Sequence, residues 1–297
     1  MGEDRIGIIG LGDQGAPMAR RLIAAGIPLG FIARRPEVVA EFSALGARHY
    51  ESGRELAENI DVLLVVVVDD AQVRDVLVGQ GVIDGLAAGS VIVIHSTVHP
   101  DTCREMADLA GRRGVELIDA PVTGGPQRSR DGTLTMPVGC DRPETLQRVR
   151  PLLLNMATTV ERLGPLGAGE ATKLLNNFFY AAHCVTALDT EHLLDLLGID
   201  KNVAAAILPS CSGSSDVLRQ RATAEIAFRP LDHAKGLEYA RNVLKKDVRL
   251  FLEVAHSRGI DMERDFGASM QIVRVSLERG HPPGTPHPQS VTPDGSQ

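Results

Sequence analysis

The chain has 297 residues, of which 43% are hydrophobic and 23% charged, and its formal net charge is −7. This length favours two domains of ordinary size, and the composition is that of a soluble globular protein. The negative charge and an aromatic content of only 3% exclude a basic, aromatic-rich surface for nucleic acid. No apolar run approaches a membrane span and the opening residues do not resemble a signal peptide, so we expect a cytoplasmic protein without a membrane partner.

The cysteines and histidines give no metal signature. The cysteines are widely spaced and include no C-x-x-C pair, which indicates reduced packing residues rather than a zinc site or a disulfide framework. His95 and His99 have metal-like spacing, but a strand precedes them and Pro100 follows, so they do not share a helix face. We therefore predict no bound metal. The four cysteines are Cys103, Cys140, Cys184 and Cys211.

A glycine-rich turn near the start carries the first functional motif. The predicted order is strand 5–9, turn 10–15 (GLGDQG) and helix 16–25. In this order Gly10 permits the tight turn, Gly12 lets a pyrophosphate approach the backbone, and Gly15 lets the helix close on the strand. The motif predicts a dinucleotide site; a glycine turn that binds nothing is the alternative.

Two arginines follow the second predicted strand, 28–33. Arg34 lies nineteen residues beyond Gly15, where an NAD site usually has an acidic residue for the ribose hydroxyls. The guanidinium groups of Arg34 and Arg35 suit the 2′-phosphate of NADP instead. We therefore predict NADP, with NAD less favoured. The alternative is that Arg34 and Arg35 are solvated residues at a helix start and face Glu37, in which case the choice between NADP and NAD stays open.

The alternation of strands and helices then continues. Further strands are predicted at 61–68, 91–94, 115–119 and 158–163, and helices at 71–78, 101–112 and 143–157, with a short capped helix from Ser52. This order predicts a doubly wound parallel sheet of the Rossmann type. Ligands bind beyond the carboxyl ends of such strands, so Ser96 and Thr97 are expected at the cofactor crevice. A Ser/Thr turn before Pro100 is an equally good interpretation.

The segment 119–139 (DAPVTGGPQRSRDGTLTMPVG) follows the strand 115–119. Its Thr-Gly-Gly turn exposes successive backbone N–H groups, which can hold a carboxylate. A simple loop between strands is the alternative.

The stretch 164–177 (GPLGAGEATKLLNN) has three glycines and then opens a long apolar helical run, 170–197. On a helix, Lys173, Asn176 and Asn177 serve nearly one face. A lysine buried beside neutral amides has a lowered pKa, which suits it to exchange a proton with an alcohol or carbonyl. The alternative is a solvated lysine with two polar neighbours.

After Ala168 only helices are predicted, at 203–208, 216–226, 236–257 and 266–277, and the tail from Arg279 has five prolines and is expected to be disordered. We therefore expect a nucleotide-binding domain at 1–166, an all-helical substrate and dimerisation domain at 167–279, and a disordered tail at 280–297.

In this order the motifs resemble the β-hydroxyacid dehydrogenase family, which includes 3-hydroxyisobutyrate dehydrogenase, tartronate semialdehyde reductase and glyoxylate/succinic semialdehyde reductase. The resemblance runs from about Arg5 to about Ala255. It rests on GLGDQGAPMA, the Ser96-Thr97 strand end, DAPVTGG, the glycine–Lys–Asn-Asn stretch 164–177 and, more weakly, Lys246-Asp247. It implies a Rossmann domain joined by a long interdomain helix to an all-α domain like that of 6-phosphogluconate dehydrogenase.

The resemblance also implies roles. Lys173 would be the catalytic acid/base and Asn177 its positioning partner, in NADP-dependent hydride transfer on a small 3-hydroxy acid or its semialdehyde. A homodimer or homotetramer is implied as well. The implied substrate contacts are Thr123, Gly124, Gly125 and Asn176. The implied cofactor contacts are Gly10, Leu11, Gly12, Gln14, Gly15, Arg34, Arg35, Val67, Thr97 and Lys246.

Two alternatives remain open. An imine reductase shares this architecture, but another residue usually holds the lysine position there. A non-catalytic NADP-binding regulatory module uses the same fold without turnover.

The chain departs from the family pattern after the double glycine, where Gln127-Arg128-Ser129 replaces small residues. Arg128 or Arg130 meets either a second acidic group or water, and we favour water. His233 and Lys235 lie in a segment longer than usual and receive no role.

Overall fold

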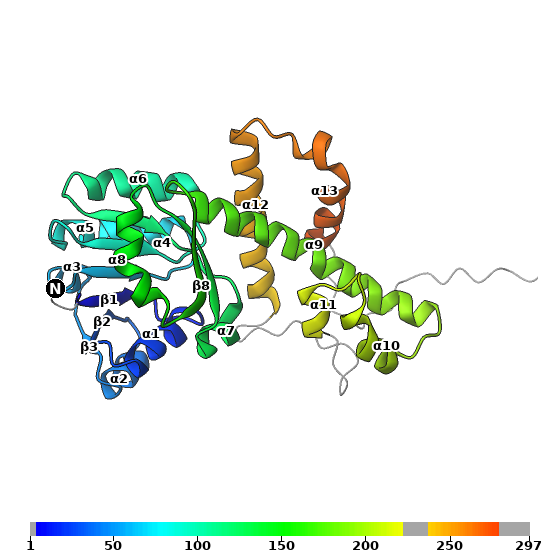
Figure 1. Cartoon of the computed structure of the whole chain (residues 1–297), viewed down its shortest axis with the longest axis horizontal. Coiled ribbons are helices and arrows are strands. Elements are labelled where there is room, and N and C mark those ends of the chain that lie inside the picture. The colour runs from blue at the N-terminus through cyan, green and yellow to red at the C-terminus, as the bar shows by residue number, and fades with distance from the viewer. Residues whose placement is uncertain (1–3, 222–236, 279–297) are drawn as a thin grey trace, which may run out of the picture. The chain divides into compact units, whose positions relative to one another are not determined.

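The computed structural model describes residues 4–221 and 237–278 (Figure 1). The described chain divides into two compact units. The first covers the chain up to Asn177 together with Lys246–Ile260, and the second covers Phe178–Lys245 and continues from Asp261.

The first unit contains an eight-stranded sheet with the order β3-β2-β1-β4-β5-β6-β7-β8. Neighbouring strands are parallel except for β6 and β7, which are antiparallel. The strands are β1 (Ile6–Ile9), β2 (Leu29–Ile32), β3 (Arg48–His49), β4 (Val62–Val65), β5 (Val91–Ile94), β6 (Glu116–Asp119), β7 (Leu134–Gly139) and β8 (Ala157–Gly164).

Helices cover both faces of this sheet, as Figure 1 shows for α1 and α2 on one side and α5 and α6 on the other. The helices of this part are α1 (Gly15–Ala24), α2 (Pro36–Ala44), α3 (Gly53–Ala57), α4 (Asp70–Arg74), the π-helical turn η1 (Asp75–Gly79), α5 (Val82–Gly85), α6 (Pro100–Gly111), α7 (Gly125–Asp131) and α8 (Pro143–Leu153).

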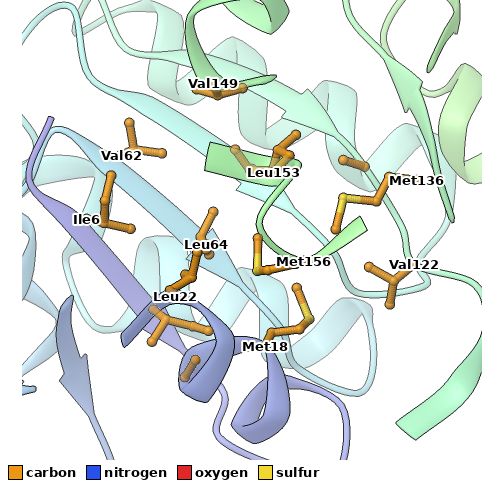
Figure 2. Packing of buried hydrophobic residues seen from close by; sticks show 14 of the residues in the cluster. Ile6, Met18, Leu22, Val62, Leu64, Val122, Met136, Val149, Leu153 and Met156 are labelled. Carbon is orange, nitrogen blue, oxygen red and sulfur yellow. The ribbon is translucent and has the colours of Figure 1, made fainter. Parts of the chain in front are cut away.

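The strands are buried on both faces because alternate residues enter two separate cores. In β4, Val62 and Leu64 pack with α1, α2 and α8, whereas Leu63 and Val65 pack with α3 to α6. Figure 2 shows Met18 and Leu22 of α1 close to Leu64 in the first of these cores. Such two-sided burial explains the continuous apolar runs by which the strands were predicted.

The predicted fold class is confirmed, and the structure adds short elements that the sequence did not indicate, among them α5. The others include the two-residue β3, the strand β7 and the short helix α7. The predicted helix 143–157 ends earlier, at Leu153, because Ala157 already begins β8.

The antiparallel junction extends beyond β6 into the DAPVTGG segment. Asp119 pairs with Gly139, and further along Thr123 forms a bridge with Thr135. The Thr123 N–H donates to the Thr135 carbonyl at 2.9 Å, and the Thr135 N–H donates back at 3.1 Å. The first part of this segment is therefore an extended strand-like piece fixed against β7.

From Ala168 onward, the described elements are helical. They are α9 (Ala168–Leu196), α10 (Lys201–Ile207), the 3₁₀ turn η2 (Leu208–Ser210), α11 (Asp216–Arg221), α12 (Leu237–Ser257) and α13 (Met262–Glu278). The second unit has its own small core, formed by Cys184, Ala187, Leu194, Ala204, Ala205, Val217 and Leu218.

The predicted tail 280–297, the end of the predicted helix 216–226, and His233 and Lys235 lie outside the described residues. Within residues 4–221 and 237–278, no helix combines the length and the hydropathy needed to cross a bilayer. The cysteines are all free, and Cys211 is exposed rather than packed.

Candidate active site

In the glycine turn after β1, two glycines are required by close backbone contacts and one faces open space. Gly10 has φ of 106°, and a Cβ there would collide with the Val66 carbonyl. A Cβ on Gly15 would collide with the Gly10 carbonyl, so the close approach of α1 to β1 requires glycine. By contrast, a Cβ on Gly12 would have no heavy atom within 4 Å. The fold of the chain therefore requires glycine at positions 10 and 15, whereas Gly12 leaves space open beside the backbone at the N-terminus of α1.

Two hydrogen bonds fix this turn, and the side-chain amide of Gln14 in it is buried. The Leu11 carbonyl accepts a 3.3 Å hydrogen bond from Arg35 Nη2, and the Gln14 carbonyl accepts one of 3.1 Å from Ser129 Oγ. The Gln14 amide nitrogen Nε2 is buried and has no hydrogen-bond partner among the described residues. Open space beside Gly12 and an unpaired buried donor together fit the pyrophosphate of a dinucleotide.

Arg34 and Arg35 follow β2 and differ in their contacts. Both are exposed, but Arg35 is engaged with Leu11 and lies 3.9 Å from a Glu37 oxygen. Arg34 makes no ion pair or hydrogen bond within the described part of the chain. Of the two guanidinium groups, that of Arg34 is the one available to an anion.

The strand end at Ser96 is held by its neighbours in the sheet. Ser96 Oγ accepts a 2.8 Å hydrogen bond from the Val67 N–H, which follows β4. The His99 N–H donates to Asp70 Oδ1 at 2.8 Å. The turn between Ser96 and His99 is thus fixed at both ends.

A chain of polar contacts links this turn to α12 and α9. Lys246 Nζ donates to the Thr97 carbonyl at 2.5 Å and lies 2.9 Å from Asp247 Oδ1. The other oxygen of Asp247 accepts a 2.6 Å hydrogen bond from Asn177 Nδ2. Asn177 Oδ1 in turn accepts one of 3.1 Å from the exposed Asn176. Thr97, Lys246 and Asn177, which are far apart in the sequence, are therefore joined within the first unit.

Lys173 lies on α9, one turn before Asn177. Its side chain is partly exposed, and its amine makes no hydrogen bond or ion pair with any residue that the structure describes. Burial lowers the pKa of Lys173 most, Lys246 lowers it further, and Asp247 and Glu170 oppose the change. A lysine with a lowered pKa and an unengaged amine is suited to exchange a proton with a bound molecule.

The Thr-Gly-Gly turn adopts a conformation that only glycine takes readily. Gly124 and Gly125 have φ of 123° and 69°. The side chain of Arg128 lies over Gly124 and occupies the place where a Cβ would be. Arg128 and Arg130 are both exposed, and Arg130 is engaged with Gln127 Oε1 at 2.7 Å. No hydrogen bond among the described residues joins this turn to Lys173.

Buried carboxyl groups that the sequence reasoning did not single out surround the start of α9. Asp119 accepts hydrogen bonds of 2.7 Å from the backbone N–H groups of Gly167 and Glu170. Burial raises the pKa of Asp119, and these N–H donors oppose the change. The second buried acid is Glu170. Asp119 and Glu170 both lie in motifs quoted above, but nothing in the sequence pattern indicated that they would be buried.

Another group missed is His95, which is buried next to the turn. Its Nδ1 lies 2.7 Å from the Ala120 carbonyl, and its Nε2 has no partner among the described residues. Burial lowers its pKa to about 4, so the ring is neutral near pH 7. Across the described ranges, no three His, Cys, Asp or Glu side chains gather in a way that would hold a metal ion.

Comparison with known proteins places this site in a family. Residues 5–164 match the model of the NAD-binding domain of 6-phosphogluconate dehydrogenase. Residues 167–281 match the model described as the NAD-binding domain of NADP-dependent 3-hydroxyisobutyrate dehydrogenase. The chain belongs to the β-hydroxyacid dehydrogenase family. As a member of this family, it is an NAD(P)-dependent oxidoreductase that acts on a CH–OH group, with a small acid as substrate.

The similarity to curated relatives extends over nearly the whole chain. An uncharacterized oxidoreductase of Mycobacterium tuberculosis is 30% identical, over 96% of this chain and 95% of its own. The NAD-dependent L-serine dehydrogenase of Pseudomonas aeruginosa is 29% identical, over 93% of each chain. The solved structure of 3-hydroxyisobutyrate dehydrogenase from Mycobacterium tuberculosis with L-serine shares the fold, with a TM-score of 0.77, 24% identity and 91% coverage of each chain.

Proposed function

We propose that this chain is an NADP-dependent dehydrogenase of a small 3-hydroxy acid, or a reductase of the matching semialdehyde, with Lys173 as general acid/base. The observation that carries the proposal is the amine of Lys173. It is unpaired within the described chain, its pKa is lowered by burial, and it lies one helical turn from Asn177. These are the properties required of a group that exchanges a proton with a carbinol oxygen.

In this mechanism a bound nicotinamide supplies the hydride acceptor or donor. During oxidation Lys173 removes the hydroxyl proton, and during reduction it returns that proton to the carbonyl oxygen. Asn177, oriented by Asp247, positions the substrate oxygen beside Lys173. Asn176, on the same helix, contributes to substrate binding. Asp247 carries the charge that balances Lys246 and favours protonated Lys173.

The proposed cofactor site extends from the glycine turn to the ends of β2 and β4. Gly10, Gly12 and Gly15, with Leu11 and Gln14, receive the pyrophosphate, and Arg34 receives the 2′-phosphate that distinguishes NADP. Arg35 supports the turn through the Leu11 carbonyl. Val67, Thr97 and Lys246 lie along the nicotinamide side of the site.

The substrate carboxylate is proposed to bind at Thr123, Gly124 and Gly125. The Thr123 N–H is engaged with Thr135, so the backbone N–H groups proposed to hold the carboxylate are those of Gly124 and Gly125, which have positive φ. L-Serine, after which the Pseudomonas aeruginosa relative is named, is a small 3-hydroxy acid and fits this class.

A homodimer or homotetramer is proposed from the apolar residues that the second unit leaves exposed. Several large hydrophobic side chains of this unit are exposed, which would suit a subunit interface. They include Leu193, Leu196, Leu197, Val203 and Ile207. The domain limits 1–166 and 167–279, the cytoplasmic location and the absence of nucleic-acid and membrane partners remain part of the proposal.

The test is a spectrophotometric panel of small 3-hydroxy acids, semialdehydes and cyclic imines with NADPH or NADP and with NADH or NAD. We expect turnover of a 3-hydroxy acid or semialdehyde, faster with the phosphorylated cofactor. In Lys173→Met, kcat should fall by about 10³-fold or more while NADPH binding is kept. Lys201→Met, which removes a lysine from the second unit, is the control.

Imine reduction without hydroxyacid turnover would favour the imine reductase alternative. Tight NADPH binding with no turnover of any compound would favour the regulatory module. A kcat in Lys173→Met close to that of Lys201→Met would remove Lys173 from its proposed role.

A further inference from the structure

Glu170 is a buried acid on the first turn of α9 that the proposed mechanism does not use. Its side chain is fully buried, with an exposed fraction of 0%. One carboxyl oxygen, Oε2, accepts a 3.1 Å hydrogen bond from the Val98 N–H. The other, Oε1, is buried and has no partner among the described residues. Burying a carboxyl group that makes a single hydrogen bond costs free energy of folding, so its presence calls for an explanation.

The hydrogen bond from Val98 joins two parts of the site. Val98 follows Thr97, whose carbonyl accepts a hydrogen bond from the amine of Lys246. Glu170 precedes Lys173 by three residues on α9, so the two side chains lie on one face, about 4.5 Å apart along the helix axis. Through Glu170, the turn that carries Thr97 is attached directly to the helix that carries Lys173.

The attachment is rigid at both ends. On the helix side, the Glu170 N–H donates to Asp119 at 2.7 Å, which fixes the first turn of α9 to the end of β6. On the turn side, Ser96 Oγ accepts a 2.8 Å hydrogen bond from the Val67 N–H. Movement of the turn relative to α9 therefore requires breaking the contact between Val98 and Glu170.

Burial and the neighbouring Asp119 raise the pKa of Glu170, which favours the neutral acid. Its other charged neighbours are Lys246, which lowers this pKa, Asp247, which raises it, and Lys173, whose own pKa Glu170 raises. A neutral carboxylic acid and a carboxamide have similar shapes, and both offer an oxygen to the Val98 N–H. Glutamine can therefore replace Glu170 in this contact, and leucine cannot.

We propose that Glu170 is a positioning residue of the hydride-transfer site: its carboxyl group fastens the Ser96–Val98 turn to α9 and so sets the distance between Thr97 and Lys173. The proposal rests on the proposed function. It concerns geometry alone and assigns no proton transfer to Glu170.

The test compares Glu170→Gln, Glu170→Leu and the control Thr172→Ala. Thr172 is on the same helical turn, but among the described residues its hydroxyl bonds only to the Ala168 carbonyl of α9 itself. For each variant, kcat and KM are measured with the best 3-hydroxy acid of the panel, NADPH affinity by cofactor fluorescence, and Tm by calorimetry. Lys173→Met is assayed in parallel.

We expect Glu170→Gln to keep kcat within about threefold of wild type, because the Val98 contact is retained. Glu170→Leu should lose about 10²-fold in kcat, the cost of a displacement of roughly 1 Å at a reacting centre. Its KM and NADPH affinity should change by less than about fivefold, because the turn that carries Thr97 moves only slightly, whereas the glycine turn and Arg34, which hold the phosphates, are untouched. Thr172→Ala should match wild type.

Two results would overturn the inference. If folded Glu170→Leu has wild-type kcat and only a lower Tm, the contact is merely structural. If Glu170→Gln is as slow as Glu170→Leu, the acid takes part through its proton or charge rather than through position. Failure of the proposed function looks different, because then Lys173→Met keeps its activity or wild type has none.

Discussion

Asn177 donates a 2.6 Å hydrogen bond from Nδ2 to Asp247 Oδ2 and thereby joins α9 to α12 within the first unit. The carboxylate of Asp247 is almost fully buried, at 3% exposure, and its other oxygen lies 2.9 Å from Lys246 Nζ. A buried charge is tolerated only when it is paired and hydrogen-bonded, so each of these partners matters.

Replacing Asn177 by Ala should destabilise the protein by about 1–3 kcal/mol, because Asp247 loses a hydrogen bond to a buried charged group. The measurement is urea unfolding of the wild type and the variant at pH 7. Asn176→Ala is the matched control, since Asn176 is exposed and its removal should cost at most about 0.5 kcal/mol. Equal stability of the two variants would show that the Asn177–Asp247 bond contributes little.

Hydroxyacid oxidation should depend on pH through Lys173. Only the neutral amine can accept the hydroxyl proton, so kcat should rise with pH and level off below the ordinary lysine value of 10.5, because burial lowers the pKa of Lys173. Asp247 raises that pKa, so Asp247→Asn should move the inflection to lower pH. The measurement is the pH profile of kcat for the two proteins. An inflection that stays in place or moves upward in Asp247→Asn would contradict this electrostatic coupling.

Replacing Arg34 by Ser should weaken NADPH binding by about 10- to 100-fold and leave NADH binding nearly unchanged, because only the 2′-phosphate loses a charged hydrogen bond. Fluorescence titration with both cofactors measures the ratio of affinities. Arg20→Ser removes the same charge from α1, where Arg20 pairs with Glu41, and should alter neither affinity. A ratio in Arg34→Ser equal to that of Arg20→Ser would exclude the proposed phosphate contact.

Acid should destabilise the protein through His95. Its folded pKa of about 4 lies below the ordinary value of 6.5, so its contribution is complete above pH 6.5 and is lost as pH falls toward 4. The loss amounts to about 3 kcal/mol over that interval. We expect His95→Gln to show a smaller fall in unfolding free energy between pH 7 and pH 4 than wild type, by urea unfolding.

His183→Gln is the control for this prediction, because His183 is exposed on α9. That variant should keep the wild-type pH dependence. If His95→Gln and His183→Gln fall equally steeply with acid, the titration of His95 does not govern acid stability.

The sequence predicted the central strands well, because both faces of β1, β4 and β5 are buried and the apolar runs are unmistakable. It did not indicate β3, which has only two residues. β7 was hidden because it contains Pro137, a residue usually found at strand edges and bulges. The sequence did not indicate the short helix α7, because Gly125 and Pro126 at its start are typical of a turn.

The candidate site could be predicted as a set of motifs but not as an arrangement. The spacing of Lys173 and Asn177 on one helix was readable, and Lys246-Asp247 was a weak match to the family. That Asp247 meets Asn177, and that Glu170 is buried against Val98, depends on tertiary packing between residues about 70 positions apart in the chain. Burial also sets the pKa of Lys173, and no local pattern encodes it.

The pairing of Thr123 with Thr135 has a practical consequence for protein engineering. Two main-chain bonds hold the turn in register, and neither involves a side chain. Libraries at the exposed positions Gln127 and Arg128 can therefore be built while the backbone of the proposed carboxylate-binding turn keeps its course.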